Sequence, residues 1–138
     1  MYSFNYLDNN LFRNVQNNMN NISLFNPVEG FEMGNMFVDL YSQYRNYKPV
    51  KLKGNSEKDR LYLELMSICF AVHDLNLYLD LHPDDVSMVA LFNDYRIKEN
   101  ELKRKYENKY GPLTISSDSS VMDNTFMWVK DVWPWEGM

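Results

Sequence analysis

A run of aliphatic residues at alternating steps of four and three positions constrains the fold of this chain more than any other feature of its sequence. The run consists of Leu61, Leu65, Ile68, Val72, Leu75 and Leu79. This spacing places every member on one face of an α-helix, so it predicts about six helical turns, or roughly 35 Å at 1.5 Å per residue. Further apolar residues beside the run widen this face, which indicates burial against more than one neighbouring element.

Signals for helix ends divide the central region into two helices joined by the bend Asn76–Asp85. Ser56 and Asp59 have the spacing of a capping box, so we expect the first helix to cover Ser56–Asp80. A second apolar pattern begins after the bend. Its members are Val86, Val89, Phe92, Tyr95, Leu102 and Tyr106, with Met88 and Leu91 alongside.

Pro83 and Gly111 mark the expected ends of the second helix. Proline fixes the dihedral angle of a first helical position, so this helix is expected to cover Pro83–Tyr110. Gly111, expected in the left-handed conformation, and Pro112 then stop it. Two antiparallel helices alone cannot bury two wide apolar faces. The chain is therefore predicted to be mainly α, with a long antiparallel helical hairpin over residues 56–113 that other segments cover.

Residues 27–55 are predicted to form an aromatic docking segment and a linker. Pro27 and Gly30 indicate one turn, Gly34 indicates another, and residues 36–44 have the apolar spacing of a short helix. An aromatic segment bounded by glycines serves either of two purposes. It covers the hydrophobic face of the hairpin in the same chain, or it docks on another protein.

The two ends of the chain differ in composition. Residues 1–26 are rich in asparagine and are expected to be a flexible arm, with a short helix formed on a partner as the alternative. Residues 114–138 are expected to be a Ser/Asp-rich linker, Thr114–Asp123, and a tail with all three tryptophans. Burying a large aromatic side chain contributes roughly 1.5–3 kcal/mol, so this tail is expected to pack on the hairpin or on a partner.

Charge and cysteine content exclude several classes of protein. The net charge is -5, and the lysines near the end of the second helix alternate with glutamates, which argues against nucleic acid as a partner. The sequence has no long apolar run, and its start lacks the basic region, apolar stretch and cleavage site of a signal peptide. We therefore expect a soluble chain made in the cytoplasm, without a membrane segment. Cys69 is the one cysteine, which excludes an internal disulfide. Its apolar helical surroundings predict a buried thiol, and the alternative is a Cys69–Cys69 link between two chains.

The strongest candidate for chemistry is a group of histidines and aspartates around the bend. The group is His73, Asp74, Asp80, His82, Asp84 and Asp85. Such side chains can ligate a metal, but acids at a helix start and polar groups in a turn also satisfy free backbone groups. The Glu-x-x-His pairs of a helical di-metal site do not occur. We expect no catalytic, cofactor or metal site; the alternative is a metal-binding or regulatory helical binding module that uses His73, Asp80 and His82.

Four blocks of sequence carry a family resemblance. They are Asp74–Asp85 (DLNLYLDLHPDD), Leu91–Tyr95 (LFNDY), Tyr106–Leu113 (YENKYGPL), and Trp128 with Trp133–Glu136 (WPWE). In this order they resemble the CotJB family of spore coat proteins of endospore-forming bacteria. Residues 29–49 resemble an N-terminal extension of clostridial members. Val132 departs from the family pattern, which often has proline before the first tryptophan of the closing pair.

The resemblance implies a non-catalytic structural protein. Such a protein is made in the mother-cell cytoplasm, is assembled into the spore coat, and is encoded beside a small companion, CotJA, and a third protein, CotJC, that resembles manganese catalases. These are the expected partners, with self-association also possible, and any metal chemistry would belong to CotJC. The residues expected to contact partners are Phe31, Phe37, Tyr41, Trp128, Trp133 and Trp135.

Overall fold

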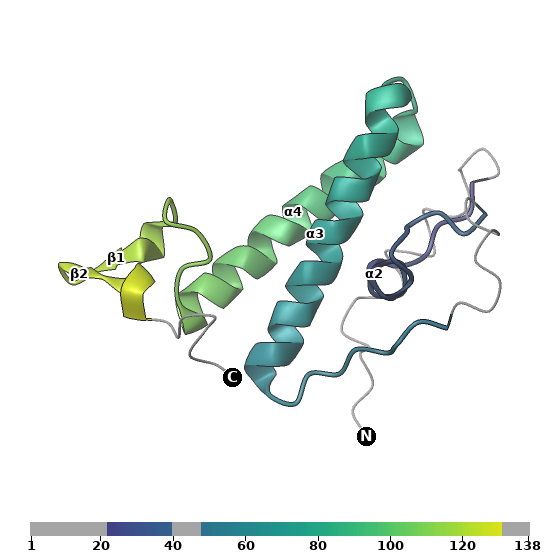
Figure 1. Cartoon of the computed structure of the whole chain (residues 1–138). Coiled ribbons are helices and arrows are strands. Elements are labelled where there is room, and N and C mark those ends of the chain that lie inside the picture. Colours follow the sequence, from purple (N-terminus) through teal and green to yellow (C-terminus); the bar gives the residue numbers. More distant parts are fainter. Residues whose placement is uncertain (1–21, 40–47, 131–138) are drawn as a thin grey trace.

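The computed structural model describes residues 22–39 and 48–130, and this part of the chain is mainly α. The elements are α2 (Pro27–Met33), α3 (Glu57–Leu81), α4 (Val86–Tyr110), the 3-10 helices η1 (Asp118–Ser120) and η2 (Met127–Lys130), and the strands β1 (Val121–Met122) and β2 (Thr125–Phe126). The helices α3 and α4 run side by side in opposite directions, α2 lies against α3, and the strands lie beyond the end of α4 (Figure 1). The predicted pair of long packed helices is confirmed.

The start of α3 forms through the predicted capping box. The Asp59 backbone N–H donates to the Ser56 hydroxyl oxygen at 3.0 Å, and the Ser56 backbone N–H donates to the Asp59 carboxylate at 3.0 Å. The Ser56 backbone N–H, with the Ser56 hydroxyl and the Asn55 backbone N–H, stabilises the ionised carboxylate and holds the pKa of Asp59 below its usual value. Two backbone donors at the helix end are thereby satisfied within four residues of sequence.

The start of α4 differs from the prediction. The helix begins at Val86 with Asp85 as its N-cap, and Pro83 lies in the turn before it. The Asp85 carboxylate accepts hydrogen bonds from the Met88 backbone N–H at 3.1 Å and from the Ser87 hydroxyl at 2.7 Å. A capping carboxylate satisfies free N–H groups, whereas proline only pre-sets a dihedral angle, so the cap determines where the helix starts.

The core lies between α3 and α4 and extends to the residues that follow α2. Its buried apolar members are Met36, Phe37, Leu61, Leu65, Ile68, Ala71, Leu75, Met88, Leu91, Tyr95, Leu102 and Tyr106. The apolar run of α3 therefore faces the core as predicted, with Val72 and Leu79 partly buried against it. The prediction for α4 is wrong at Val86 and Val89, which are exposed, because Met88 and Leu91 occupy the side of the helix that packs on α3.

The segment before the hairpin also differs from the prediction. A helix, α2, forms where a turn was expected, since the Asn26 side chain accepts from the Glu29 backbone N–H at 2.9 Å and Pro27 stands in the first turn. Gly34 ends this helix in the left-handed conformation, with φ of 72°. The expected helix over residues 36–44 is wrong for residues 36–39, which are not helical; residues 40–44 lie outside the described residues.

Residues 114–130 carry more regular structure than the linker predicted from sequence. After η1, the strands β1 and β2 pair antiparallel, with Val121 opposite Phe126. Asp123 and Asn124 form the two-residue turn with φ of 49° and 60°, a conformation that aspartate and asparagine tolerate. At the end of α4, Gly111 has φ of 108° and ψ of 174°, so it stops the helix at the predicted place but not in the left-handed helical conformation.

Candidate partner-binding surface

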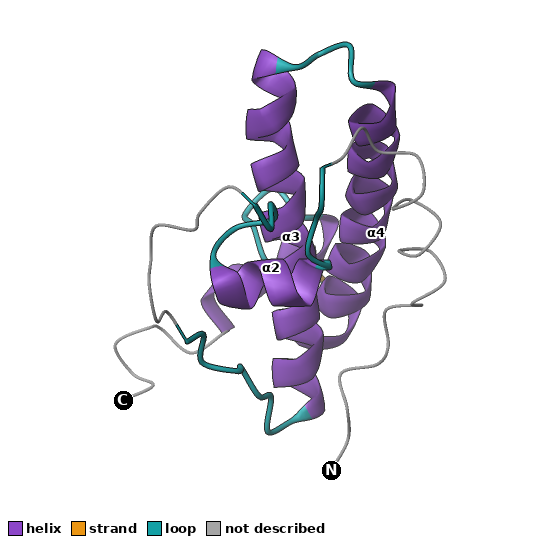
Figure 2. Ribbon diagram, turned by 90° about the vertical axis from the view of Figure 1, so that its right-hand side faces the viewer, coloured by secondary structure: helices purple, strands orange, loops and turns teal. Residues whose placement is uncertain are grey.

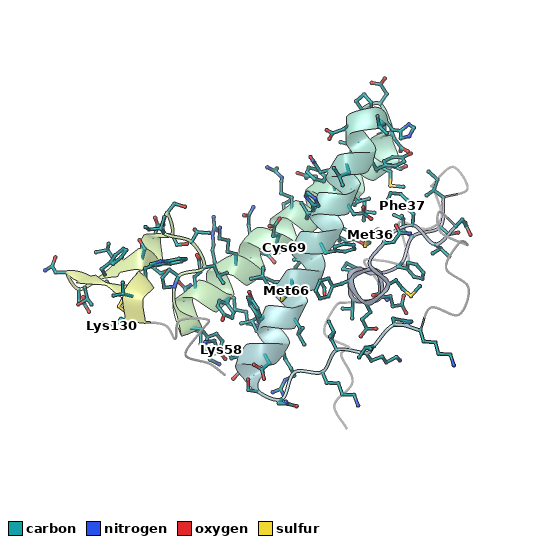
Figure 3. All side chains as sticks on the ribbon, in the orientation of Figure 1. Met36, Phe37, Lys58, Met66, Cys69 and Lys130 are labelled. Carbon is teal, nitrogen blue, oxygen red and sulfur yellow. The ribbon has the colours of Figure 1, made fainter. Side chains whose placement is uncertain are left out.

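The six residues expected to contact partners do not form one site among the described residues. Phe31 is partly buried, with its ring centroid 5.9 Å from that of Phe70 on α3. Phe37 is only 7% exposed and lies 5.3 Å, centroid to centroid, from the Tyr78 ring. Phe37 and Lys130, which ends η2, lie on opposite sides of the hairpin (Figure 3). Trp128, in η2, is 37% exposed. Tyr41, Trp133 and Trp135 lie outside the described residues.

The α2 segment, residues 22–39, folds back on itself and docks on α3 (Figure 2). The Phe25 backbone N–H donates to the Met36 carbonyl at 2.8 Å, and the Met36 backbone N–H donates to the Asp74 carboxylate at 2.9 Å. The Met36 side chain is fully buried. A Cβ at Gly30 would lie 2.4 Å from the Met36 sulfur, so only glycine allows this close approach without a shift. These contacts favour the interpretation in which this segment covers the hairpin in the same chain.

We predict that Asp74→Ala loosens the α2 segment. The substitution leaves the partly buried Met36 N–H without its acceptor, which costs about 1–3 kcal/mol, and the expected result is a lower free energy of unfolding and faster amide hydrogen exchange at residue 36. The matched control is Asp80→Ala on the same helix, because the Asp80 side chain is exposed. Equal hydrogen exchange at residue 36 in both variants would contradict this assignment.

The exposed apolar residues of the C-terminal region form what we call the tail surface. Its members are Val121, Met122, Phe126, Trp128 and Val129. The tail is tied to the end of α4 by Glu107, whose carboxylate accepts from the Leu113 backbone N–H at 3.1 Å and from the Ser117 hydroxyl. Val121 and Phe126 are cross-strand partners, so these two exposed side chains lie on one face of the hairpin, and exposed apolar groups of this kind are typical of protein interaction sites. Sequence reasoning missed Val121 and Met122. The available signal for this hairpin was the Asp-Asn pair between Val-Met and Thr-Phe, two dipeptides with β-branched and large apolar side chains.

Asp85 and His82, two of the polar residues around the bend, have structural partners, whereas His73, Asp80 and Asp84 are exposed. The Asp85 carboxylate also accepts from the Tyr78 hydroxyl at 3.0 Å, so it joins the last turn of α3 to the start of α4. The Ser87 hydroxyl, with the other donors, holds the pKa of Asp85 below its usual value, while burial and then Asp85 raise the pKa of Tyr78. The His82 ring lies 4.4 Å from the Tyr78 ring. Within residues 22–39 and 48–130, no three His, Cys, Asp or Glu side chains are grouped so that they could hold a metal ion.

Cys69 lies at the interface of the two long helices and is partly buried (Figure 3). Its thiol donates to the Glu99 carboxylate, with a sulfur to oxygen distance of 3.4 Å. Burial, and then the negative charge of Glu99, raise the pKa of this thiol to about 12. The thiol is therefore protonated at neutral pH, and only a thiolate is a strong nucleophile.

The sequence of the hairpin and tail decides the family of this chain. The CotJB protein family matches residues 59–136, which is more than half of the chain. The chain belongs to the CotJB family. Searches of curated proteins and of solved structures found no match to it. CotJB is a family of spore coat proteins that are not known as enzymes.

The CotJB match can be placed on the structure. It covers α3 from its first turn, all of α4 and the tail surface, so the α2 segment is an N-terminal extension before the family domain. The block Asp74–Asp85 includes the acceptor for the Met36 N–H and the cap of α4. None of the helices among the described residues is both long and apolar enough to cross a membrane.

Proposed function

We propose that this CotJB protein is a non-catalytic assembly adaptor of the bacterial spore coat. It is made in the mother-cell cytoplasm and enters the coat by binding other coat proteins, among them a small CotJA-like protein and the manganese-catalase-like CotJC. The observation that carries the proposal is the tail surface: apolar and aromatic side chains exposed inside the part of the chain that defines the family.

The contacts of the tail surface suit it to bind a partner. Tryptophan contributes more binding energy than most residues when a protein interface buries it. Trp128 is 37% exposed, so a partner can bury more of its side chain. Glu107 ties Leu113 and Ser117 to the last turns of α4, so the tail begins beside the end of this helix. We place the main partner contacts at Trp128, Trp133 and Trp135.

The remaining expected contacts have a second role in this proposal. Phe31 and Phe37 hold the α2 segment on α3, and Phe37 is buried there, so we expect partner contact in this part of the chain at the partly buried Phe31 and at Tyr41. The non-catalytic role is supported by the bend residues, since Asp74 and Asp85 accept backbone hydrogen bonds of the fold itself. It is also supported by the protonated thiol of Cys69.

Co-purification of the tagged full chain from sporulating cells tests the proposal. Trp128→Ala, and separately a chain that ends at Lys130, are each expected to reduce recovery of the catalase-like partner at least about tenfold, because loss of a buried aromatic contact costs 2 kcal/mol or more in a typical interface. The shortened chain keeps every described helix and strand. Ile97→Ala is the matched control, since Ile97 is exposed on α4 outside the tail surface. Full recovery of this partner with both tail variants would refute the proposal.

A further inference from the structure

Charge is segregated along the α3–α4 hairpin. Residues 61–95 contain no lysine or arginine and six acidic residues. The stretches on either side, residues 48–60 and 96–110, together contain eleven basic and five acidic residues, a net charge of +6. Because the chain reverses direction at the bend, these two basic stretches meet at the open end of the hairpin, and the bend lies at the other end (Figure 1).

The bend end, which we call the acidic pole, combines carboxylates with apolar side chains. Asp80 and Asp84 are exposed there. Leu81 is 80% exposed and Val86 is 81% exposed, so the last residue of α3 and the first residue of α4 both present large apolar side chains to solvent. The acidic pole therefore offers both charge and apolar area to a binding partner.

The open end, which we call the basic pole, has the complementary composition. Lys51 and Lys53 are exposed in the irregular stretch before α3 and alternate with the exposed Val50 and Leu52. Lys105, on α4, is also exposed.

Contacts of Glu57 bring the two basic stretches together. Lys109 of α4 lies 2.6 Å from the Glu57 carboxylate at the start of α3. Lys109, Arg60 and Lys105 lower the pKa of this carboxylate, which places all three cations around one end of the hairpin. The stretch with Lys51 and Lys53 leads directly into α3 at the same end.

We propose that the acidic pole of one copy binds the basic pole of a second copy. The two poles lie at opposite ends of helices of 25 residues, about 37 Å apart at 1.5 Å per residue, so one molecule cannot pair its own poles. The partner is a second copy because this chain itself carries both complementary surfaces. Opposite charges at an interface orient the two molecules, and the exposed apolar side chains at each pole become buried.

This contact is head-to-tail, so it leaves one acidic and one basic pole free in every open assembly. Contacts of this type propagate into open chains unless their geometry closes a ring. The inference goes beyond the adaptor role, because it involves neither the tail surface nor a coat partner. Purified full-length protein therefore tests it separately.

Sedimentation velocity of the wild-type protein is the first measurement. At low ionic strength the average mass is expected to rise above 16.5 kDa with increasing protein concentration. In 1 M NaCl it is expected to return to the monomer value, because the screening length falls to about 3 Å. A monomer at every concentration at low ionic strength would overturn the proposal, as would an association that 1 M NaCl leaves unchanged.

Two neutralised variants then test the two poles. The acidic-pole variant is Asp80→Asn with Asp84→Asn, and the basic-pole variant is Lys51→Gln, Lys53→Gln and Lys105→Gln. All five side chains are exposed, and the Asp85 cap is kept in both variants. The matched control is Asp118→Asn with Asp123→Asn, which removes two exposed carboxylates from the tail.

Each pole variant alone is expected to self-associate at least about tenfold more weakly than wild type, while the control associates as wild type does. An equimolar mixture of the two variants is expected to form dimers and no larger species, because one intact acidic pole meets one intact basic pole. The proposal would be overturned if either pole variant self-associated as strongly as the wild type. It would also be overturned if the mixture of the two variants stayed monomeric. Circular dichroism of each variant checks that the helices are retained.

Discussion

Replacing Leu75 with alanine is expected to lower the free energy of unfolding by about 2–5 kcal/mol. Leu75 lies near the bend end of α3 and has no exposed surface. The substitution removes buried apolar area and leaves a cavity, because the facing side chains on a rigid helix relax only partly. For a chain of this size the melting temperature is expected to fall by about 7–17 °C in thermal unfolding, and urea unfolding measures the loss of free energy directly.

Leu77→Ala provides the matched control for Leu75→Ala. It removes the same atoms from the same helix two positions away, but Leu77 is 52% exposed. Surface substitutions of this kind change stability by about 0.5 kcal/mol or less. Similar losses of stability for the two variants would contradict the placement of the α3–α4 interface.

Cys69 is expected to react tens of times more slowly, roughly ten- to a hundredfold, with a disulfide reagent at pH 8 in the folded protein than in the urea-unfolded chain. A rise of the thiol pKa from 9.0 to about 12 lowers the thiolate fraction at this pH roughly a thousandfold. The more basic thiolate is about 15 to 30 times more nucleophilic, which offsets part of this loss. The rate of thiolate release, followed by absorbance, measures the difference.

The pH dependence of this reaction has a definite sign. Because the folded protein holds the thiol proton more tightly, the rate is expected to keep rising above pH 9, where the unfolded chain levels off. For the same reason, the part of the stability that comes from the neutral buried thiol is present below pH 9 and is lost as the pH rises toward 12. Glu99→Gln is expected to speed the reaction, because it removes the negative charge that opposes ionisation. A rate that levels off near pH 9 in the folded wild type would contradict this account.

The helix ends show which parts of the fold were predictable from sequence. The start of α3 and the end of α4 were predicted correctly, because Ser56, Asp59 and Gly111 act through partners within four residues. The start of α4 was predicted three residues too early. Its cap, Asp85, is completed by the Tyr78 hydroxyl from the preceding helix, and this contact exists only once the hairpin has formed.

The candidate site was less predictable than the helices. The sequence marked Phe37 and Trp128 in the same way, as aromatic residues outside the hairpin, but Phe37 is buried against Tyr78 and Trp128 is exposed. Aromatic content alone does not distinguish a core residue from a surface residue. Their difference arises because the Asp74 carboxylate holds the Met36 N–H, and with it the neighbouring Phe37, against α3.

By itself, the sequence determined that two long helices form, where the first begins and the second ends, and which side of α3 is apolar. These features depend on hydrogen bonds within one helical turn and on a spacing that matches the helical repeat. Only the tertiary structure decided which segment covers α3, which side of α4 faces the core, and that basic residues far apart in sequence gather at the open end of the hairpin. These features depend on contacts between residues tens of positions apart, such as Met36 with Asp74 and Glu57 with Lys109, and local spacing does not encode such contacts.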